Sequence, residues 1–539
     1  MSLHTSTVDY QIAQGFSPND ETASNPLEHL SAKDKELFER FGWGATVVPR
    51  HNLIHLGFEH YVAEQPQSIA IITDCGRQCS YADLQQRINF LAQHLHQQGI
   101  SAGDSVCLYM HRGIELVAAI FACLKLGASY VPQDMQVCPQ QQRSVIAQVV
   151  KAKSVLTTSE YVEMLESDFP GQLLAVDSLL ESMPHKVIAT TFEDVVDSSD
   201  TAVVIFTSGT TGTPNGVQVS HRNLCNILLT SPGDLSIAPG DVVTQLLNIA
   251  FDMAAWEILG ALCNGATLYI RGDDIQRAAE QASVIIATPS VLSRIAPERC
   301  SRIRVVAVAG EPCPLPLAQR WSSQCTFYNS CGPTETTIIN TAATYTHSDP
   351  VLSIGAPTPN NTVYVLNDVH QPCAIGEVGE MWAGGDCVTK GYINNAALTN
   401  ERYRPDPFIP GRTMFRTRDL GRWCNNGELE HLGRVDDQVK IRGFRVELDA
   451  VSAVLERTQG CHQAVALKFN NRHLVAFVSP ANVDIQCARE SIAKALPYYC
   501  QPLFILSAKS FPQTIRGKLD KRALLQWACQ YQREQELQA

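Results

Sequence analysis

The stretch that decides the fold is Val203-Val204-Ile205-Phe206-Thr207-Ser208-Gly209-Thr210-Thr211-Gly212-Thr213-Pro214-Asn215-Gly216-Val217. Its first four residues are β-branched or aromatic, which is typical of a short buried strand. The glycines and hydroxyl residues that follow predict a loop whose backbone N–H groups turn toward an anion. The loop lacks the Gly-Lys-Ser/Thr ending of the common P-loop. A polyphosphate is its natural ligand, and a plain surface turn is the alternative interpretation.

Strands and helices alternate on both sides of this loop. Buried-type strands are predicted at residues 267–270, 284–287 and 304–309, and helices at 256–262 and from about His221. This alternation predicts an α/β fold, with parallel-type sheets flanked by helices. Beyond Gly433 the pattern of apolar and polar residues changes. It predicts a strand at residues 439–442, a helix at 449–457 and two further strands at 464–469 and 474–478. We therefore expect a polar tail at residues 1–30, a large multi-layer region at 31–435 and a small α+β domain at 436–539.

The composition narrows the classes of partner. The chain has 539 residues, 45% of them hydrophobic, and a net charge of −12. An acidic chain repels phosphate backbones, so no nucleic acid is expected as a partner. No basic region followed by an apolar core opens the chain, and no apolar run is long enough for membrane insertion. The 18 scattered cysteines do not form a disulfide framework. A cytoplasmic protein is expected.

Six motifs, in their usual order, resemble those of the adenylate-forming superfamily, which includes acyl-CoA synthetases, luciferases and the adenylation domains of nonribosomal peptide synthetases. They are the glycine-rich loop, Phe251-Asp252-Met253-Ala254-Ala255-Trp256-Glu257, Asn329-Ser330-Cys331-Gly332-Pro333-Thr334-Glu335-Thr336-Thr337, Phe415-Arg416-Thr417-Arg418-Asp419, Gly433-Arg434-Val435-Asp436-Asp437-Gln438-Val439-Lys440-Ile441-Arg442-Gly443 and Pro512-Gln513-Thr514-Ile515-Arg516-Gly517-Lys518-Leu519-Asp520. The resemblance covers about residues 30 to 527. It implies a large domain that binds ATP and amino acid, and a mobile lid.

The resemblance also assigns roles to residues. Lys518 is the expected catalytic residue, bridging the substrate carboxylate and the α-phosphate. Glu335 is expected to hold Mg²⁺, with capping of a helix turn as the alternative. Asp419 and Arg434 are expected at the ribose, and Asp436 at the hinge. The full expected ATP-binding set is Thr207, Ser208, Gly209, Thr210, Thr211, Gly212, Gly310, Glu311, Asn329, Ser330, Cys331, Gly332, Thr334, Asp419 and Arg434.

Asp252 indicates the branch of the superfamily. It stands where amino-acid-activating members carry the aspartate that pairs with the substrate ammonium, and a buried carboxylate needs such a partner. A helix N-cap is the alternative role. Residues 41–46 resemble the linker that precedes adenylation domains of peptide synthetases. The implied reaction forms an aminoacyl-AMP and then a thioester on a pantetheine thiol.

The resemblance places nine residues on the amino-acid pocket: Asp252, Met253, Trp256, Ala287, Ala307, Ala309, Ser330, Ile338 and Ile339. The expected lining has no charge apart from Asp252 and Lys518, so it favours a neutral substrate. Met253 and Trp256 are expected to fill the front of the pocket, which favours a small amino acid, with glycine first and alanine or serine next. The alternative role of these two side chains is ordinary packing of a helix. The three alanines open space deeper in, and a medium hydrophobic amino acid is the rival.

No carrier domain follows Lys518, so a separate phosphopantetheinylated carrier protein is the expected partner. Lone ligases of this kind resemble those that supply D-alanine to teichoic acids or glycine to lipid A, and also orphan loaders of peptide synthetases; the glycine preference favours the lipid A type. Three residues depart from the family pattern: Asn215 replaces a lysine, Arg418 a glycine and Cys331 a tyrosine. An acyl- or aryl-CoA ligase and a degenerate nucleotide-binding protein are the competing functions.

Overall fold

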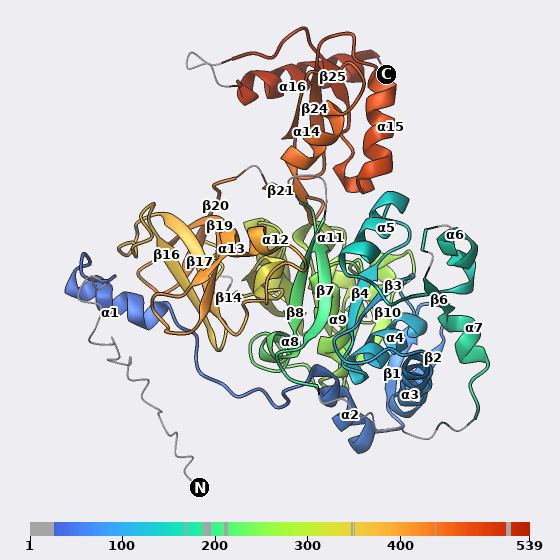
Figure 1. Ribbon diagram of the computed structural model, residues 1–539. Helices are drawn as coiled ribbons and strands as arrows, with labels where there is room; N and C mark the ends of the chain where they lie inside the picture. Colours follow the sequence, from blue (N-terminus) through green and yellow to red (C-terminus); the bar gives the residue numbers. More distant parts are fainter. Residues whose placement is uncertain are drawn as a thin grey trace.

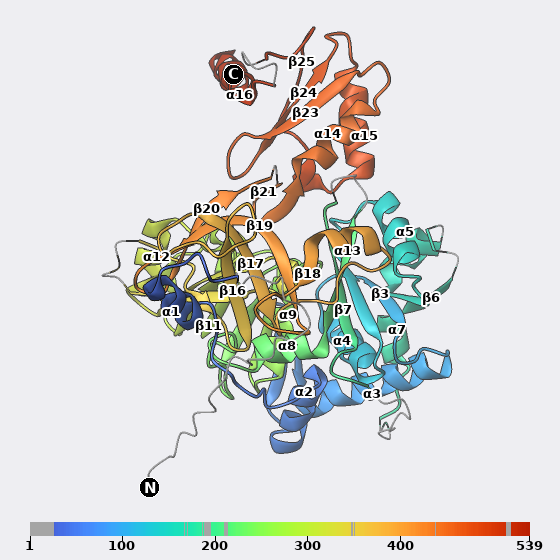
Figure 2. The same ribbon diagram turned by 60° about the vertical axis from the view of Figure 1, so that its left-hand side comes forward.

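The protein consists of a large N-terminal domain and a smaller C-terminal domain, which stands at one side of the large one (Figure 1). The computed structural model describes residues 26–166, 168–169, 171–185, 187, 196–209, 214–346, 349, 351–436, 438–513 and 519–538. The small domain stays at the same end after a 60° turn of the view, above α5 (Gln140–Val149) and β19 (Thr413–Trp423) (Figure 2).

The large domain holds two mainly parallel sheets. The first runs in the order β15 (Ala356–Pro357), β14 (Thr341–Tyr345), β13 (Thr326–Cys331), β12 (Val305–Val308), β11 (Val284–Ala287), β9 (Val242–Gln245), β10 (Thr267–Ile270), β1 (Ile69–Thr73) and β2 (Gln78–Ser80). The second runs in the order β6 (Gln172–Ala175), β5 (Ser154–Thr157), β3 (Ser105–Tyr109), β4 (Ser129–Gln133), β7 (Thr201–Thr207) and β8 (Asn215–Ser220). Antiparallel strands lie only at the described sheet edges: β2, β14, β15 and β8.

The largest hydrophobic core joins these two sheets through helices. It is formed by side chains of both sheets and of α2 (Ile54–Glu64), α3 (Tyr81–Gln97), α4 (Ile114–Lys125), α8 (His221–Leu228) and α9 (Asp252–Leu262). The other helices of this region are α6 (Val162–Glu166), α7 (Val176–Glu181), α10 (Ile275–Ala279), α11 (Pro289–Leu292) and α12 (Leu315–Ser322). Burial on both faces explains why these strands read as continuous apolar runs in the sequence.

An antiparallel sheet completes the large domain. It contains β16 (Asn361–Leu366), β17 (Gly379–Gly385), β19, β18 (Tyr403–Pro405) and β20 (Leu429–Arg434), and α13 (Ala396–Arg402) precedes β18. The helix α1 (Ala32–Phe41) lies beside this sheet (Figures 1 and 2), where Phe38 packs on Tyr364 of β16. Two neighbouring strands of this sheet, β19 and β20, carry Asp419 and Arg434 toward the small domain.

The small domain begins with the hairpin of β21 (Gln438–Ile441) and β22 (Phe444–Glu447). A three-stranded sheet of β23 (Gln463–Lys468), β24 (Leu474–Ser479) and β25 (Ile505–Ser507) follows, with α14 (Leu448–Glu456), α15 (Ile485–Ala495) and α16 (Lys521–Gln538). Two apolar clusters of this domain contain no large-domain residue. The small domain therefore has a core of its own.

The fold class predicted from the sequence is confirmed. The predicted strand at residues 267–270 is β10, and the helix predicted from 256 begins four residues earlier, at Asp252. All 18 cysteines lie in the described part of the chain and none forms a disulfide. In the same residues, no helix is both long and apolar enough to cross a bilayer.

Candidate active site between the domains

A cavity of about 770 Å³ lies between the large and the small domain. Thr207 at the end of β7, Ser208 directly after it, Asp252 on α9 and Thr334 line it from the large domain. The β21–β22 hairpin lines it from the small domain. Motifs that are far apart in the sequence therefore meet in one place, as the carboxyl ends of parallel strands bring them together.

The start of the glycine-rich loop contacts the hairpin. The Ser208 hydroxyl donates a hydrogen bond of 3.0 Å to the backbone carbonyl of Arg445. Thr210, Thr211 and Gly212 lie outside the described residues, and Gly209 lines a small neighbouring cavity. Asn215, which replaces the usual lysine, lies on β8, and its side-chain oxygen accepts a hydrogen bond from Asn395.

Asp252 is half-buried at the cavity wall. The N-cap of α9 is Phe251, and Asp252 is the first residue of the helix, so the N-cap alternative is wrong. Burial raises the pKa of Asp252, while a hydrogen bond from Thr334 and the charge of Lys440 act in the opposite direction. Its carboxylate faces the cavity, and the described residues place no cation at ion-pair distance from it.

Lys440 on β21 brings a positive charge into the same cavity. Burial lowers the pKa of this lysine, and Arg445 lowers it further, whereas Asp252 and Asp419 raise it. The ammonium of Lys440 therefore sits in the field of the two carboxylates that the sequence assigned to substrate and ribose.

Glu335 is almost fully enclosed, with 1% of its side chain exposed. It lies on a 3₁₀ turn, η3 (Thr334–Thr336), and its carboxylate accepts hydrogen bonds from the Tyr392 hydroxyl at 2.6 Å and from Arg445 Nη1 at 2.8 Å. Burial alone would raise the pKa of Glu335, but Arg445 and Arg402 outweigh it and hold the pKa at about 2. Helix capping does not account for this carboxylate, which is half of a buried pair between the domains.

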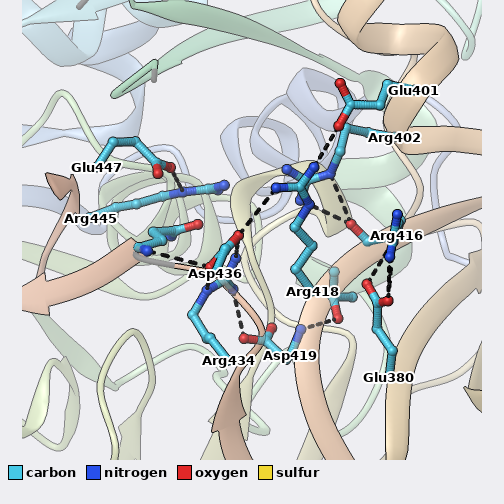
Figure 3. Close-up of polar contacts among 12 residues, drawn as sticks. Glu380, Glu401, Arg402, Arg416, Arg418, Asp419, Arg434, Asp436, Arg445 and Glu447 are labelled. Carbon is cyan, nitrogen blue, oxygen red and sulfur yellow. Dashed lines mark hydrogen bonds and ion pairs between the residues drawn. The ribbon is translucent and has the colours of Figure 1, made fainter. Parts of the chain in front are cut away.

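A chain of ion pairs joins the predicted ribose site to the predicted hinge (Figure 3). Arg434 Nη1 donates to Asp419 at 2.6 Å, and its Nε and Nη2 donate to the two oxygens of Asp436 at 2.8 and 3.0 Å. Burial would raise the pKa of Asp419, but His431 and Arg434 hold it below its usual range. Both carboxylates are therefore ionised and share one guanidinium.

Arg418, the second departure from the family pattern, belongs to the same network. Its Nη2 lies 2.5 Å from Glu401 Oε1, and its Nη1 lies 3.7 Å from Asp436 Oδ2 (Figure 3). Its φ of 63° is in the left-handed region, where glycine is relaxed and other residues are strained. The side chain therefore contacts Glu401 and the predicted hinge residue Asp436.

The remaining predicted nucleotide residues differ in their surroundings. Gly310 and Gly332 line the cavity. Glu311 accepts hydrogen bonds from the backbone and hydroxyl of Ser290, and Asn329 donates to the carbonyl of Ser353. Burial raises the pKa of the Cys331 thiol to about 12. The buried hydroxyl of Ser330 has no hydrogen-bond partner in the described structure.

The predicted amino-acid pocket is split between cavity and core. Asp252, Met253 and Ile338 line the cavity. Trp256 is fully buried and its indole N–H donates to the Gly233 carbonyl at 2.7 Å, which is the packing role left open as an alternative. The other predicted lining residues that lie in hydrophobic clusters are Ala287, Ala307, Ala309 and Ile339. Lys518 lies outside the described residues.

Sequence reasoning missed a group of arginines at the cavity. Six line it: Arg112, Arg271, Arg294, Arg442, Arg445 and Arg472. Arg112 and Arg271 donate to the carbonyls of Gln245 and Leu246, and within the described residues neither has a carboxylate in ion-pair distance. Burial, with Arg271 nearby, lowers the pKa of Arg112 to about 10. No single motif marks this group, because its members come from separate segments of both domains.

The residues around the cavity fit a magnesium nucleotide with one condition. The described residues contain no cluster of three or more acidic, histidine or cysteine side chains suited to a metal. Mg²⁺ needs only one or two carboxylates when phosphate oxygens and water complete its shell, and Glu335 can supply one. Both oxygens of Glu335 are engaged here, so Arg445 must first withdraw.

Comparisons with known proteins agree with this geometry. Residues 58–393 match the family model described as AMP-binding enzyme. Adenylate-forming reductase 03009 of Coprinopsis cinerea is 40% identical over 517 residues, covering 95% of this chain and 50% of that protein. Gramicidin S synthase 1 of Brevibacillus brevis is 32% identical over 497 residues, covering 88% of this chain and 44% of that protein. The chain spans about half the length of these curated relatives.

Solved structures show a similar fold. A four-domain nonribosomal peptide synthetase, bound to AMP and glycine, superposes with a TM-score of 0.64 at 28% identity, covering 91% of this chain and 37% of that one. The family match covers more than half of the chain, over the strands and loops that build the large-domain wall of the cavity. On this evidence the chain belongs to the AMP-binding enzyme family.

Proposed function

We propose that this protein activates a small neutral amino acid with ATP, as an aminoacyl-AMP, and transfers it to the phosphopantetheine thiol of a separate carrier protein. The observation that supports it most is Asp252. Its carboxylate faces the cavity, and no described cation lies within ion-pair distance. An α-ammonium group would supply the missing positive charge, whereas an acyl or aryl acid would leave the carboxylate unpaired.

The walls near Asp252 favour a small side chain. Met253 follows it on α9, and its sulfur lies 3.5 Å from where a Cβ on Gly310 would stand. The Met253 side chain therefore lies beside Gly310 on the cavity wall, and its bulk next to Asp252 favours a small substrate side chain. Glycine is our first candidate, and the nonribosomal peptide synthetase structure with bound AMP and glycine is consistent with it.

Several residues would act on ATP and Mg²⁺. Joining a carboxylate to a phosphate brings two anions together, so the site must neutralise charge and align the groups. Glu335 would hold Mg²⁺, which supplies charge neutralisation on the phosphates when bound. Asp419 would accept hydrogen bonds from the ribose after releasing Arg434, and Lys518 would bridge the reacting carboxylate and the α-phosphate.

The arginines favour an anionic thiol donor. Three of the six are on the large domain and three on the small domain, so both walls of the cavity carry positive charge. The phosphate of a phosphopantetheine arm and an acidic carrier protein would both meet this charge favourably. The negative net charge of the protein does not prevent such local attraction.

The test is pyrophosphate release with ATP, Mg²⁺ and a panel of the common amino acids, for the native protein and Asp252→Asn. We expect glycine, alanine or serine to give the highest rate. Loss of a charge-assisted contact of about 2–3 kcal/mol predicts that kcat/KM of the variant falls about 30- to 150-fold. Absence of amino-acid-dependent release from the native protein would refute the proposal.

A second candidate is activation of an acyl or aryl acid, because Adenylate-forming reductase 03009 is 40% identical and its name specifies no amino acid. The same variant separates the two functions. If Asp252 pairs with no ammonium, Asp252→Asn leaves activation of the acid unchanged. Coenzyme A would then also serve as the thiol acceptor.

A further inference from the structure

Arg418 combines two features that need a common explanation. Its backbone has a φ of 63°, so a glycine would fit this place on β19 with less strain. Its side chain nevertheless reaches two carboxylates, Glu401 at 2.5 Å and Asp436 at 3.7 Å. A strained residue persists where its surroundings determine it, and such residues cluster at functional places.

The two partners of Arg418 lie on different sides of the hinge region. Glu401 belongs to α13 of the large domain, and Asp436 follows β20, two residues before the β21 strand of the small domain. Arg434 also binds Asp436, with both of its oxygens. Asp436 thus contacts two guanidinium groups (Figure 3). Among the contacts of the described residues, only that with Arg418 connects Asp436 to α13.

The position of the hinge determines what the hairpin covers. In the present arrangement Arg445 occupies Glu335, and the Arg445 carbonyl accepts a hydrogen bond from Ser208. Under the proposed function, the nucleotide and its metal would need Ser208 and Glu335, the two large-domain residues in these contacts. Any contact that fixes Asp436 here therefore favours the state in which the hairpin fills the site.

We propose that Arg418 is a positioning residue that braces the hinge Asp436 against Glu401 and so favours the hairpin-docked orientation over the nucleotide-loading orientation. The expected effect of Arg418 on the reaction steps rests on the proposed function, whereas its expected effect on the domain orientation does not. The brace should slow adenylate formation and favour the thiol-transfer step. Because Glu401 is half-exposed, the contact with Arg418 should change the equilibrium between the two domain orientations only moderately, by about three- to tenfold.

The experiment uses Arg418→Gly, which removes the brace and also relieves the backbone strain, so folding should not suffer. Glu401→Gln removes the brace without touching β19. Arg422→Ala is the matched control, because Arg422 lies on the same strand, pairs with Glu430 at 2.7 Å and, among the described residues, has no ion pair with Asp436. Arg418→Lys keeps the charge and should restore part of the effect.

Two readouts are measured on the full chain. Small-angle scattering of the ligand-free protein should show a shift toward the undocked orientation for Arg418→Gly and Glu401→Gln, and none for Arg422→Ala. The ratio of pyrophosphate release to thioester formation, with a phosphopantetheinylated carrier, should rise about three- to tenfold in the same two variants.

Unchanged scattering together with an unchanged ratio in both brace variants would overturn the proposal. A ratio that changes equally in Arg422→Ala would also overturn it, since the effect would then belong to β19 as a whole. If the native protein releases no pyrophosphate, the proposed function fails, and the scattering comparison alone decides whether Arg418 braces the hinge.

Discussion

Glu335 and Arg445 form the most consequential contact at the residue scale. The carboxylate is buried, and its charge is stabilised by a cation that belongs to the other domain. Removing a partner from such a pair leaves an uncompensated buried charge. Under the proposed function, Mg²⁺ would replace Arg445 at Glu335, because withdrawal of Arg445 without a replacing cation would leave the buried carboxylate uncompensated.

The depressed pKa of Glu335 predicts a pH dependence of stability. Its folded pKa of about 2 lies below the ordinary value of 4.5, so the stabilisation is complete above pH 4.5 and is lost as the pH falls toward 2. The shift corresponds to roughly 3 kcal/mol. The free energy of unfolding of the native protein should thus exceed that of Glu335→Gln at pH 6.5, with a gap that narrows by pH 3.

Urea denaturation at a series of pH values measures this gap. Glu298→Gln is the control, because Glu298 is paired with Arg320 at the surface and 63% of its side chain is exposed. Its effect should stay small at every pH. A gap for Glu335→Gln that is constant between pH 6.5 and 3 would contradict the assigned electrostatic role.

At the scale of elements, the β21–β22 hairpin provides charge interactions between the two domains. It brings Lys440 and Arg445 from the small domain to carboxylates of the large one. Its turn contains Gly443, with a φ of 86°, and a Cβ there would lie 2.9 Å from Thr288 Cγ2. The hairpin can approach the large domain this closely because residue 443 has no side chain.

Gly443→Ala should impair the reaction step that uses the docked hairpin. The added methyl group meets the β-branched Thr288, which also caps α11, so neither side yields easily. We expect thioester formation to fall at least about tenfold, while pyrophosphate release changes less than about threefold. Single-turnover measurements of the two steps would separate these effects.

Gly460→Ala is the matched control for backbone strain. Gly460 lies in the same domain with a φ of 80°, but a Cβ there meets no atom within 4 Å. Both variants should lose similar stability, and only Gly443→Ala should lose thioester formation. Equal kinetic losses in the two variants would assign the effect to strain rather than to docking.

The elements were predictable from sequence because local patterns determine them. The β-branched runs at β10 and β11 lie where expected, since strands buried on both faces must be apolar along their length. The motifs that form the cavity were also predictable in part, as Asp252 and Ser208 show. The partners of those motifs were not, because Arg445 reaches Glu335, and Arg112 reaches the cavity, only through the tertiary fold.

At the scale of the whole molecule, charge is distributed unevenly. The chain carries a net charge of −12, yet six arginines line the cavity between the domains. Positive charge in a recess of an acidic protein attracts anions locally while the outer surface repels them. The cavity should therefore select anionic ligands that are slender enough to enter between the domains.

The double variant Arg112→Met and Arg271→Met should weaken binding of the anionic thiol donor. We expect its KM to rise about tenfold or more and the salt dependence of this KM to decrease, because charge pairs are lost. Thioester formation at 0.05 and 0.5 M salt measures both, with Arg320→Met as a control on an exposed pair outside the cavity. An unchanged KM with unchanged salt dependence would argue against the role of these arginines.

The protonated thiol of Cys331 has a practical consequence for chemical labelling. A pKa of about 12 leaves almost no thiolate at neutral pH, and alkylating reagents attack the thiolate. Maleimides should therefore react first with the exposed Cys75, Cys487 and Cys529, of which Cys75 lies in the large domain and the other two in the small domain. Fluorophores could report the distance between the two domains while the nucleotide site stays chemically intact.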